Sequence, residues 1–308
     1  MQSEAPPSGA NSISPGDTSA PVARLGGRGS EPGRFQRPAG ISFDAFGHLF
    51  VADRGNHRIL EFDAGLVLVG ERGGFGFEPG RFVDPRAVVA DRGTRVYVLD
   101  TSGGRVQTLD ARREPEGVLL DARGAAGGLG IHRPVAMAVD GAGRLFLSDR
   151  ETQSLLVYSA SGDSLAAWGG FGDGPGQFRR IAGACVDARG SVWVADEARR
   201  RVVRLDAAGG YVSEFEAAPE SLAASRPFGV AVAADGRVAV ADPGLRRVTV
   251  FSASGQAQAV LEGDGTHPFE EPVAVAWGGD RLAVADQGAH VVLVFRMPGV
   301  PARPAGAR

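Results

Sequence analysis

The chain has 308 residues, a formal net charge of −3 and one cysteine, Cys185. A single cysteine excludes any disulfide within the chain, and no apolar run approaches the roughly 18 residues of a membrane-spanning helix. Every basic residue is an arginine. An anion site in this protein would therefore use planar, bidentate guanidinium groups rather than lysine point charges.

Residues 1–20 carry Ser, Pro, Gly and Ala and almost no large apolar groups. Such a segment cannot bury enough surface to order itself, so we expect a disordered tail or tether. It also lacks the basic-then-apolar pattern of a signal peptide. We expect a soluble protein in an unknown compartment. The segment is either an ordinary tail or the tether of an exported or lipid-anchored protein whose signal has been removed.

The segment Gly33–Phe62 is the first copy of a repeated unit. A Phe-x-x-Pro step leads to a short β-rich run, an Asp-x-x-Gly turn, a second run ending in Asp53, a polar loop and a third run. The second run, five residues ending in aspartate, occurs at residues 49–53, 96–100, 145–149, 192–196, 238–242 and 282–286. Six copies at a nearly constant spacing indicate a repeat architecture.

The spacing of the copies, 44 to 49 residues, suits one four-stranded blade of a propeller. Short runs of Val, Ile and Phe separated by Asp and Gly favour strands over amphipathic helices. We therefore predict an all-β fold, a six-bladed β-propeller of four-stranded antiparallel blades over residues 21–297. A disordered C-terminal tail is expected at residues 298–308.

The two ends of the repeat region are incomplete in complementary ways. The segment 21–27 resembles the last strand of a blade without its first three strands, whereas Val291–Phe295 is a third strand without a fourth. We predict that Val22–Leu25 is the outer strand of the last blade. The N-terminal strand would then close the ring and remove an unpaired sheet edge.

The predicted inner strands are short and begin with a small residue, because strands crowd together near the axis. They are expected at residues 40–43, 87–90, 136–139, 183–186, 229–232 and 274–277. Aromatic residues recur in the second strands of blades 1–4, at Phe50, Tyr97, Phe146 and Trp193. Ala239 and Ala283 take this position in blades 5 and 6, which predicts thinner packing there unless Phe228 and Trp277 compensate.

Blade 1 combines several features in one stretch: Gly33, Phe35, Pro38, Asp44, Gly47, Val51–Asp53, Asn56–Ile59 and Phe62. With these residues the chain resembles the NHL-repeat β-propellers, over roughly Pro21–Arg296. The resemblance implies a six-bladed propeller. For activity it implies binding platforms, sensor domains and occasionally lyases. Later copies drift from the pattern, since Ser154 and Val291 replace the loop arginine of blade 1.

In four blades an arginine follows the repeated aspartate by five residues. The pairs are Asp53 with Arg58, Asp100 with Arg105, Asp196 with Arg201, and Asp242 with Arg247. The aspartate itself recurs in all six blades, and such repetition is typical of scaffold residues, so we interpret these pairs as braces of the loops. Loss of one partner of a buried pair would cost roughly 3 to 5 kcal/mol. A ring of carboxylates that binds metal is the weaker alternative.

The loops on the face where the inner strands begin differ between blades. Their arginines are Arg37, Arg54, Arg133, Arg150, Arg180, Arg199, Arg200, Arg226 and Arg246. Asp84 and Glu271 stand in the corresponding loops of blades 2 and 6. Because these loops gather around the mouth of the channel, we predict that this face binds an anionic ligand. The alternative is a solvated rim of neutralised charges.

Catalytic groups are less clearly indicated. The resemblance implies that lyase relatives hold a metal with histidines near the axis. Here His57 and His290 lie in loops of neighbouring blades, His132 precedes blade 3, and no histidine falls on a predicted inner strand. A Gly-x-Ser-x-Gly nucleophile motif is also missing from the sequence. We therefore predict no catalytic residue, no metal and no cofactor.

Three functions follow in order of preference. The first is a monomeric, non-enzymatic binding or scaffold propeller that takes a protein, a peptide or an anionic ligand at the channel mouth. The second is a lyase or hydrolase, with or without a metal. The third is binding of single-stranded RNA, which needs exposed aromatic residues for stacking. The loops offer few of these, namely Phe75, Phe77 and Phe171.

Overall fold

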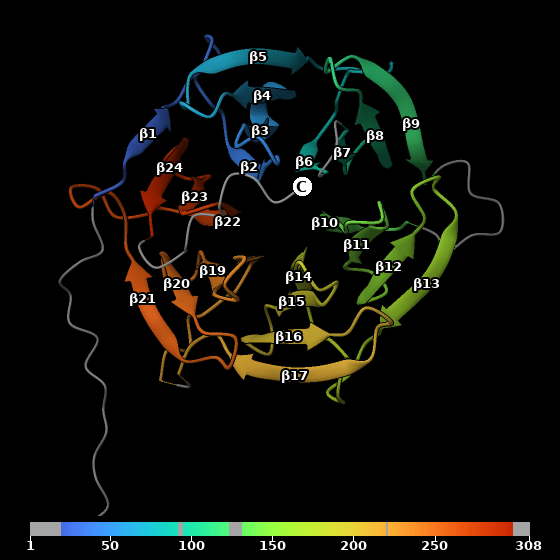
Figure 1. The fold of residues 1–308 in the computed structure, drawn as a ribbon, viewed down its shortest axis with the longest axis vertical. Coiled ribbons are helices and arrows are strands. Elements are labelled where there is room, and N and C mark those ends of the chain that lie inside the picture. The colour runs from blue at the N-terminus through green and yellow to red at the C-terminus, as the bar shows by residue number, and fades with distance from the viewer. Residues whose placement is uncertain (1–19, 92–94, 123–130, 220, 298–308) are drawn as a thin grey trace, which may run out of the picture.

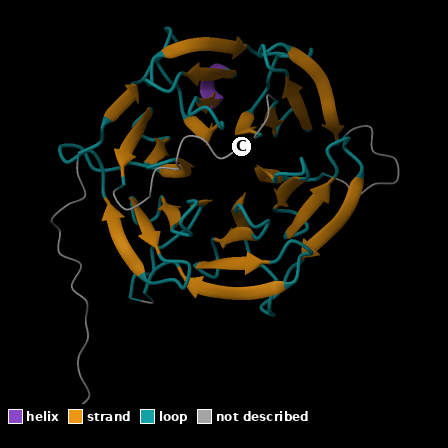
Figure 2. Cartoon of the chain, viewed as in Figure 1, coloured by secondary structure: helices purple, strands orange, loops and turns teal. Residues whose placement is uncertain are grey.

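The computed structural model describes residues 20–91, 95–122, 131–219 and 221–297. These residues form six four-stranded antiparallel sheets arranged around a central axis (Figure 1). Apart from one 3-10 turn, η1 (Arg54–Asn56), the described part contains only strands and loops (Figure 2). The predicted all-β, six-bladed propeller is confirmed.

The first three blades run outward from the axis in chain order. Blade 1 contains β2 (Pro38–Phe43), β3 (Leu49–Asp53), β4 (Arg58–Phe62) and β5 (Leu68–Gly73). Blade 2 contains β6 (Pro85–Ala90), β7 (Val96–Asp100), β8 (Arg105–Leu109) and β9 (Pro115–Asp121). Blade 3 contains β10 (Pro134–Val139), β11 (Leu145–Asp149), β12 (Ser154–Tyr158) and β13 (Ser164–Gly169).

The last three blades follow the same plan, and blade 6 takes its outer strand from the other end of the chain. Blade 4 contains β14 (Ile181–Val186), β15 (Val192–Asp196), β16 (Arg201–Leu205) and β17 (Tyr211–Glu216). Blade 5 contains β18 (Gly229–Val232), β19 (Val238–Asp242), β20 (Arg247–Phe251) and β21 (Ala257–Leu261). Blade 6 contains β22 (Pro272–Gly278), β23 (Arg281–Asp286), β24 (Val291–Arg296) and β1 (Ala23–Gly26).

The ring closes where β1 pairs antiparallel with β24. The register matches Ala23 with Val294 and Gly26 with Val291, and the Val22 amide donates to the Val294 carbonyl over 2.7 Å. In Figure 1 the blue β1 lies beside the red β24, so the first and last strands share one sheet. The outer edge of β24 is therefore covered by backbone hydrogen bonds.

Glycine allows the inner strands to approach one another closely. A Cβ atom on Gly40 would lie 2.6 Å from the Cα atom of Ala87, and one on Gly229 would lie 2.7 Å from the Val273 carbonyl oxygen. Both distances are too short for a side chain. The small residues of these strands are thus a steric requirement of six sheets that meet at one axis.

The hydrophobic core is divided into clusters between neighbouring blades. Where blades 5 and 6 lack the aromatic residue of the second strand, the next inner strand supplies it. Trp277 of β22 packs against the cluster that contains Ala239, and Phe43 of β2 packs against the cluster that contains Ala283. Compensation of the thin positions therefore comes from Trp277, as predicted, and from Phe43. The prediction for Phe228 is wrong, since this ring packs against the cluster that contains Trp193.

The predicted tails, residues 1–20 and 298–308, lie outside the described residues apart from Ala20. The glycine-rich join between blades 2 and 3 is also left out from residue 123 to residue 130. Within the described part, no helix has the length and hydropathy needed to cross a membrane.

The strand order gives the propeller two different faces. The mouth face carries the loops that precede each inner strand and the loops between second and third strands. The turn face carries the hairpins of each blade, such as Asp44–His48 and Asp63–Val67, which are closed by backbone hydrogen bonds of 3.0 and 2.9 Å. Asp44 and Asp63 also accept amide hydrogens within their own turns, which is the behaviour of turn aspartates.

Deletion of residues 1–26 should destabilise the propeller, because β24 would lose its partner and expose an unpaired edge. We expect a lower thermal midpoint and concentration-dependent association, measured by calorimetry and by light scattering. Deletion of residues 1–19 ends before the pairing begins and serves as the control. An unchanged midpoint after removal of β1 would show that the ring does not depend on this closure.

Candidate functional site

A buried aspartate ends the second strand of every blade. Asp53, Asp100, Asp149, Asp196, Asp242 and Asp286 are all at most 3% exposed. Each carboxylate accepts amide hydrogens from the loop that precedes the inner strand of its own blade. Examples are Arg179 and Arg180 on Asp196, over 2.9 and 3.0 Å, and Glu270 and Glu271 on Asp286, both over 2.8 Å. The aspartates therefore hold the mouth-face loops.

The loop after each aspartate turns through a left-handed residue four positions later. These residues and their φ angles are His57 (58°), Gly104 (66°), Gln153 (55°), Arg200 (56°), Arg246 (53°) and His290 (58°). The same aspartates bind this loop as well, for example through the amides of Arg199 and Leu245. Arg200 and Arg246, predicted as ligand residues, thus occupy a structural turn position.

The arginines of the four predicted braces behave in two ways. Arg58 lies 2.9 Å from Asp53, and Arg105 lies 3.3 Å from Asp100, with both partners buried. Arg58 also reaches the carbonyl oxygens of Ser30, Glu31 and Arg34. Burial raises the pKa of the Asp53 carboxyl even though Asn56, Gln36 and Arg58 all donate to it.

In blades 4 and 5 the arginine has a different environment. Arg201 forms its ion pair with Glu214 on the adjacent outer strand instead of Asp196. The Nε atom of Arg247 is buried and has no hydrogen-bond partner in the described part. The expectation of an Asp–Arg brace is therefore corrected for these two blades, since the aspartates there bind backbone amides and, in blade 5, the hydroxyl of Ser225.

The loop histidines join neighbouring blades. The Nδ1 atom of His57 lies 2.8 Å from the Val83 carbonyl of blade 2, so this nitrogen must carry the proton. The Nδ1 atom of His290 accepts from the Arg37 amide of blade 1 over 2.9 Å, so here it must be unprotonated. Among the described residues, no group of three or more His, Cys, Asp or Glu side chains is placed to hold a metal ion.

Charged side chains on the mouth face also bridge the blades. The Arg54 guanidinium of blade 1 pairs with Asp84 of blade 2, and the Arg37 guanidinium of blade 1 donates to Gln287 of blade 6 over 3.3 Å. The Glu197 side chain of blade 4 is almost fully buried at 1% exposure. Its carboxylate is shared by three arginines of the predicted face: Arg150 at 2.6 Å, Arg180 at 3.5 Å and Arg226 at 2.7 Å.

Arg133 and Arg199 complete the predicted set. Arg133 is exposed on the loop before β10, its amide donates to Asp149, and its guanidinium has no hydrogen bond or ion pair within the described residues. Arg199 instead points towards the outer part of blade 4, where it contacts the Gln177 carbonyl and Glu214. The arginines near the channel are thus Arg37, Arg54, Arg133, Arg150, Arg180 and Arg226.

Arg86 was not anticipated. It lies on β6 directly after Pro85, at a position that is apolar in the other blades: Ala39, Val135, Ala182, Phe228 and Val273. Burial lowers the pKa of Arg86, and the positive charges of Arg54, Arg150 and Arg133 add to this effect, while Asp84 opposes it. The same comparison between repeats could have revealed it, because it is a charged residue at an otherwise apolar position.

Aromatic side chains extend the mouth face towards its rim at blades 1 and 2. Phe75 and Phe77 are 66% and 52% exposed, with ring centroids 6.5 Å apart. Phe75 meets the His57 ring edge-on at 5.2 Å. His57 contacts Val83, the neighbour of Asp84, so the aromatic pair is linked by direct contacts to the charged loop of blade 2.

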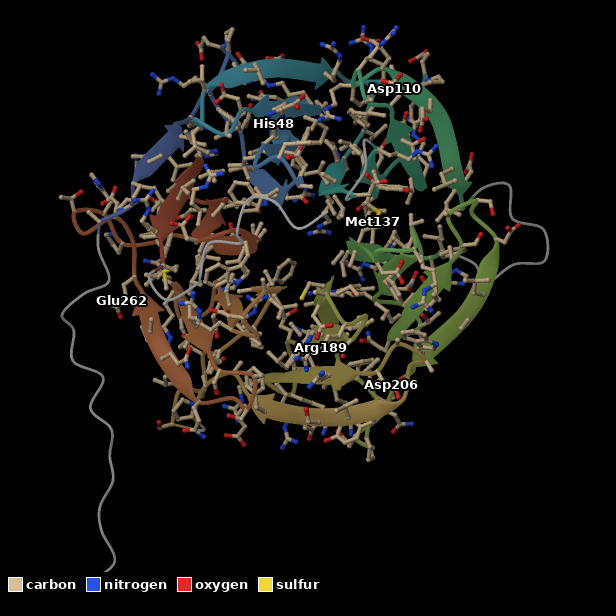
Figure 3. All side chains as sticks on the ribbon, viewed as in Figure 1. His48, Asp110, Met137, Arg189, Asp206 and Glu262 are labelled. Carbon is tan, nitrogen blue, oxygen red and sulfur yellow. The ribbon has the colours of Figure 1, made fainter. Side chains whose placement is uncertain are left out.

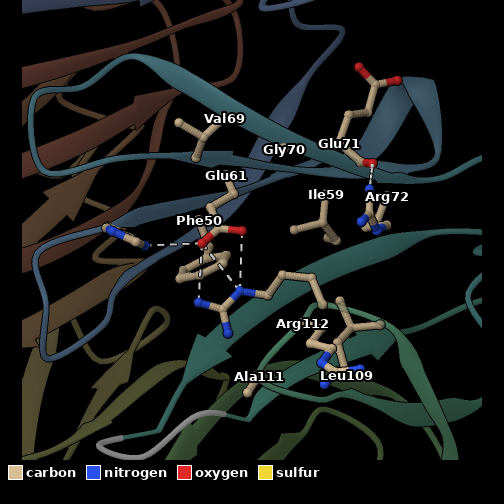
Figure 4. A pocket seen from close by; sticks show the side chains of 12 residues that line it. Phe50, Ile59, Glu61, Val69, Gly70, Glu71, Arg72, Leu109, Ala111 and Arg112 are labelled. Atoms are coloured by element: carbon tan, nitrogen blue, oxygen red, sulfur yellow. Dashed lines mark hydrogen bonds and ion pairs between the residues drawn. The ribbon is translucent and has the colours of Figure 1, made fainter.

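A separate cavity of about 310 Å³ lies between blades 1 and 2 near the turn face (Figure 4). Phe50, Ile59 and Leu109 form its apolar part, and Glu61 accepts hydrogen bonds from Arg113 at 3.1 Å and contacts His48 at 3.1 Å. The Arg113 guanidinium also stacks over the Phe50 ring at 4.8 Å. A similar stack joins Arg281 of blade 6 to Phe43 of blade 1, so the charged groups of the cavity belong to the packing between blades.

Comparisons with known proteins agree with this architecture. Residues 35–62, which span β2 to β4, match the NHL repeat family model. The protein is thus a six-bladed β-propeller with an NHL repeat in its first blade. A search of curated protein sequences finds no significant match.

Solved structures resemble the chain over most of its length at 12% sequence identity. A streptogramin B lyase has a TM-score of 0.61, with 89% of this chain and 87% of that chain covered. A selenomethionine-substituted virginiamycin B lyase from Staphylococcus aureus has a TM-score of 0.60, with coverage of 90% and 88%. A catalytically inactive histidine-to-alanine variant of that lyase with quinupristin has a TM-score of 0.58, with coverage of 88% and 82%. At this identity the likeness concerns the fold.

Replacement of Asp196 by alanine should destabilise the protein by about 3 kcal/mol or more, because the amides of Arg179, Arg180 and Arg199 lose their shared, buried acceptor at once. Denaturant unfolding measures this change. Asp206→Ala is the matched control, since this aspartate binds amides within an exposed turn-face hairpin, labelled in Figure 3. Equal losses in the two variants would contradict a special role for the buried carboxylate.

Proposed function

We propose that the protein is a non-enzymatic binding propeller whose mouth face takes an acidic protein or peptide. The observation that carries the proposal is the excess of arginine over carboxylate around the channel mouth. Arg133 has no side-chain partner within the described residues, and three arginines share the single carboxylate of Glu197. Arg180 and Arg226 remain more than half exposed while they do so, at 55% and 59%.

This arrangement suits recognition of carboxylates. Guanidinium groups bind carboxylates with two parallel hydrogen bonds, and loops held by a rigid scaffold lose little freedom on binding. The amides of Arg133, Arg180 and Arg226 are fixed by the buried aspartates, so the starting points of these side chains are preorganised. The exposed Phe75 and Phe77 offer an apolar contact on the same face, as protein interfaces commonly require.

A lyase or hydrolase is the second candidate, favoured by the fold shared with the streptogramin and virginiamycin B lyases. In this chain the histidines of the neighbouring loops, His57 and His290, are engaged in hydrogen bonds between blades. Conversion of quinupristin by the purified protein with added divalent metal, followed by chromatography, tests this candidate. Turnover that is lost in His57→Ala or His290→Ala would favour an enzyme over a binding module.

Poly-L-glutamate serves as a probe for the binding function. We expect the wild-type protein to bind it with an affinity that falls as salt is added, because the contact is electrostatic. Arg133→Ala and Arg180→Ala should each weaken binding by about 1 kcal/mol, roughly fivefold, as measured by fluorescence anisotropy. The turn-face variants Arg112→Ala and Arg189→Ala remove the same charge and should bind as the wild type does.

Two results would count against the proposal. If the turn-face and mouth-face variants lose equal affinity, the effect is one of net charge and the mouth is not the site. If poly-uridylate binds more tightly than poly-L-glutamate and this binding requires Phe75 and Phe77, the face is a single-stranded RNA site, because bases stack on exposed aromatic rings.

A further inference from the structure

Arg86 combines a cationic side chain with a position where the other blades are apolar. It lies on the inner strand β6, directly beside the axis, whereas the arginines named above lie on loops. It is partly buried and forms no hydrogen bond or ion pair within the described residues. The repeat architecture does not need a charge at this position, since the equivalent residues are Ala39, Val135, Ala182, Phe228 and Val273.

The groups around Arg86 are mostly positive. Arg54, Arg150 and Arg133 act on it as like charges, and Asp84 is the opposing carboxylate. Asp84 is already bound by Arg54, through two hydrogen bonds, and by the Ser102 hydroxyl. Arg150 is held by Glu197 and by the Ile181 carbonyl. Arg86 and Arg133, on adjacent blades, are left without a counter-charge of their own.

A partly buried cation among like charges is unfavourable in the free protein, because burial and repulsion both disfavour the charged form. The lowered pKa of Arg86 reports this cost. Polar groups in such positions are normally paired. A side chain that lowers the stability of the free protein and has no structural role is a feature of binding sites, where a ligand supplies the missing interaction.

We propose that Arg86 and Arg133, with Arg54 and Arg150 beside them, form a subsite for one oxyanion group, a carboxylate or a phosphate, at the mouth of the channel between blades 2 and 3. Two guanidinium groups can donate several hydrogen bonds to one oxyanion. Arg54 and Arg150 are each held in place by an ion pair, to Asp84 and to Glu197, beside the subsite. The subsite shares the mouth face with the proposed binding function and would anchor the acidic group of its ligand.

Thermal unfolding with sodium phosphate, sodium acetate and sodium chloride at equal ionic strength tests the subsite. The proteins are the wild type, Arg86→Met, Arg86→Lys and the turn-face control Arg189→Met, whose position is labelled in Figure 3. We expect phosphate, acetate or both to raise the wild-type midpoint beyond chloride. Arg189→Met should respond equally, and Arg86→Met should lose the response, with an affinity at least about tenfold weaker.

Two further results are expected. Without added anion, Arg86→Met should unfold at a higher temperature than the wild type, because an unpaired charge is replaced by an apolar side chain of similar length. Arg86→Lys keeps the charge but cannot form two parallel hydrogen bonds, so it should respond weakly. A response to phosphate alone identifies a phosphoryl ligand, and an equal response to acetate identifies a carboxylate.

Three outcomes would overturn the subsite: no anion effect beyond chloride in the wild type, an effect that persists in Arg86→Met, or failure of Arg86→Met to fold. The third would assign Arg86 to the structure. If the anion response does not depend on Arg86 but poly-L-glutamate binding still requires Arg133 and Arg180, the subsite fails while the binding function stands. If poly-L-glutamate binds to neither the wild type nor Arg86→Met but the anion response depends on Arg86, the subsite stands without a polypeptide ligand.

Discussion

A buried carboxylate at the end of each second strand holds the mouth face together. In every blade it gathers amide hydrogens from the loop before the inner strand. Such hydrogen bonds to a charged acceptor are among the stronger ones in proteins, and an amide left without its acceptor in a buried loop is costly. The conformation of these loops is therefore fixed by the scaffold, down to a left-handed residue at the same offset in each blade. Side chains that project from the loops can vary without disturbing this framework.

The charge of the mouth-face side chains is what varies most between the blades. The residue after each buried aspartate is Arg54, Thr101, Arg150, Glu197, Pro243 or Gln287 around the ring. Several of these residues bridge to the next blade, so part of the charge at the mouth belongs to the contacts between blades. Arg86 and Arg133 are left over from this pairing. Their position, between the aromatic rim of blades 1 and 2 and the arginine cluster around Glu197, concentrates uncompensated positive charge on one side of the channel.

Apolar packing between neighbouring blades holds the ring together. Six clusters of apolar side chains lie between the blades, and five of them include or adjoin an aromatic ring on which an arginine stacks. Phenylalanines of the mouth-face loops also belong to four of these clusters and are at most 1% exposed: Phe35, Phe82, Phe178 and Phe269. The likeness to lyases at 12% identity concerns the fold, which is the scaffold that holds the loops. Any binding or catalytic function depends on the side chains that the loops carry.

The period of the repeat, its strands and the incomplete blades at the two ends could be read directly from the sequence, because local hydrophobic patterns and turn residues determine a blade. The buried aspartates were identifiable for the same reason, since all six copies keep them. The partner of Arg201 was not, because a side chain five residues from an aspartate can equally reach an acid on the adjacent outer strand, as Arg201 does with Glu214. The proximity of Arg86 to Arg54, Arg133 and Arg150 was decided by the tertiary structure alone, because the ring places blades 1, 2 and 3 beside one another around the axis.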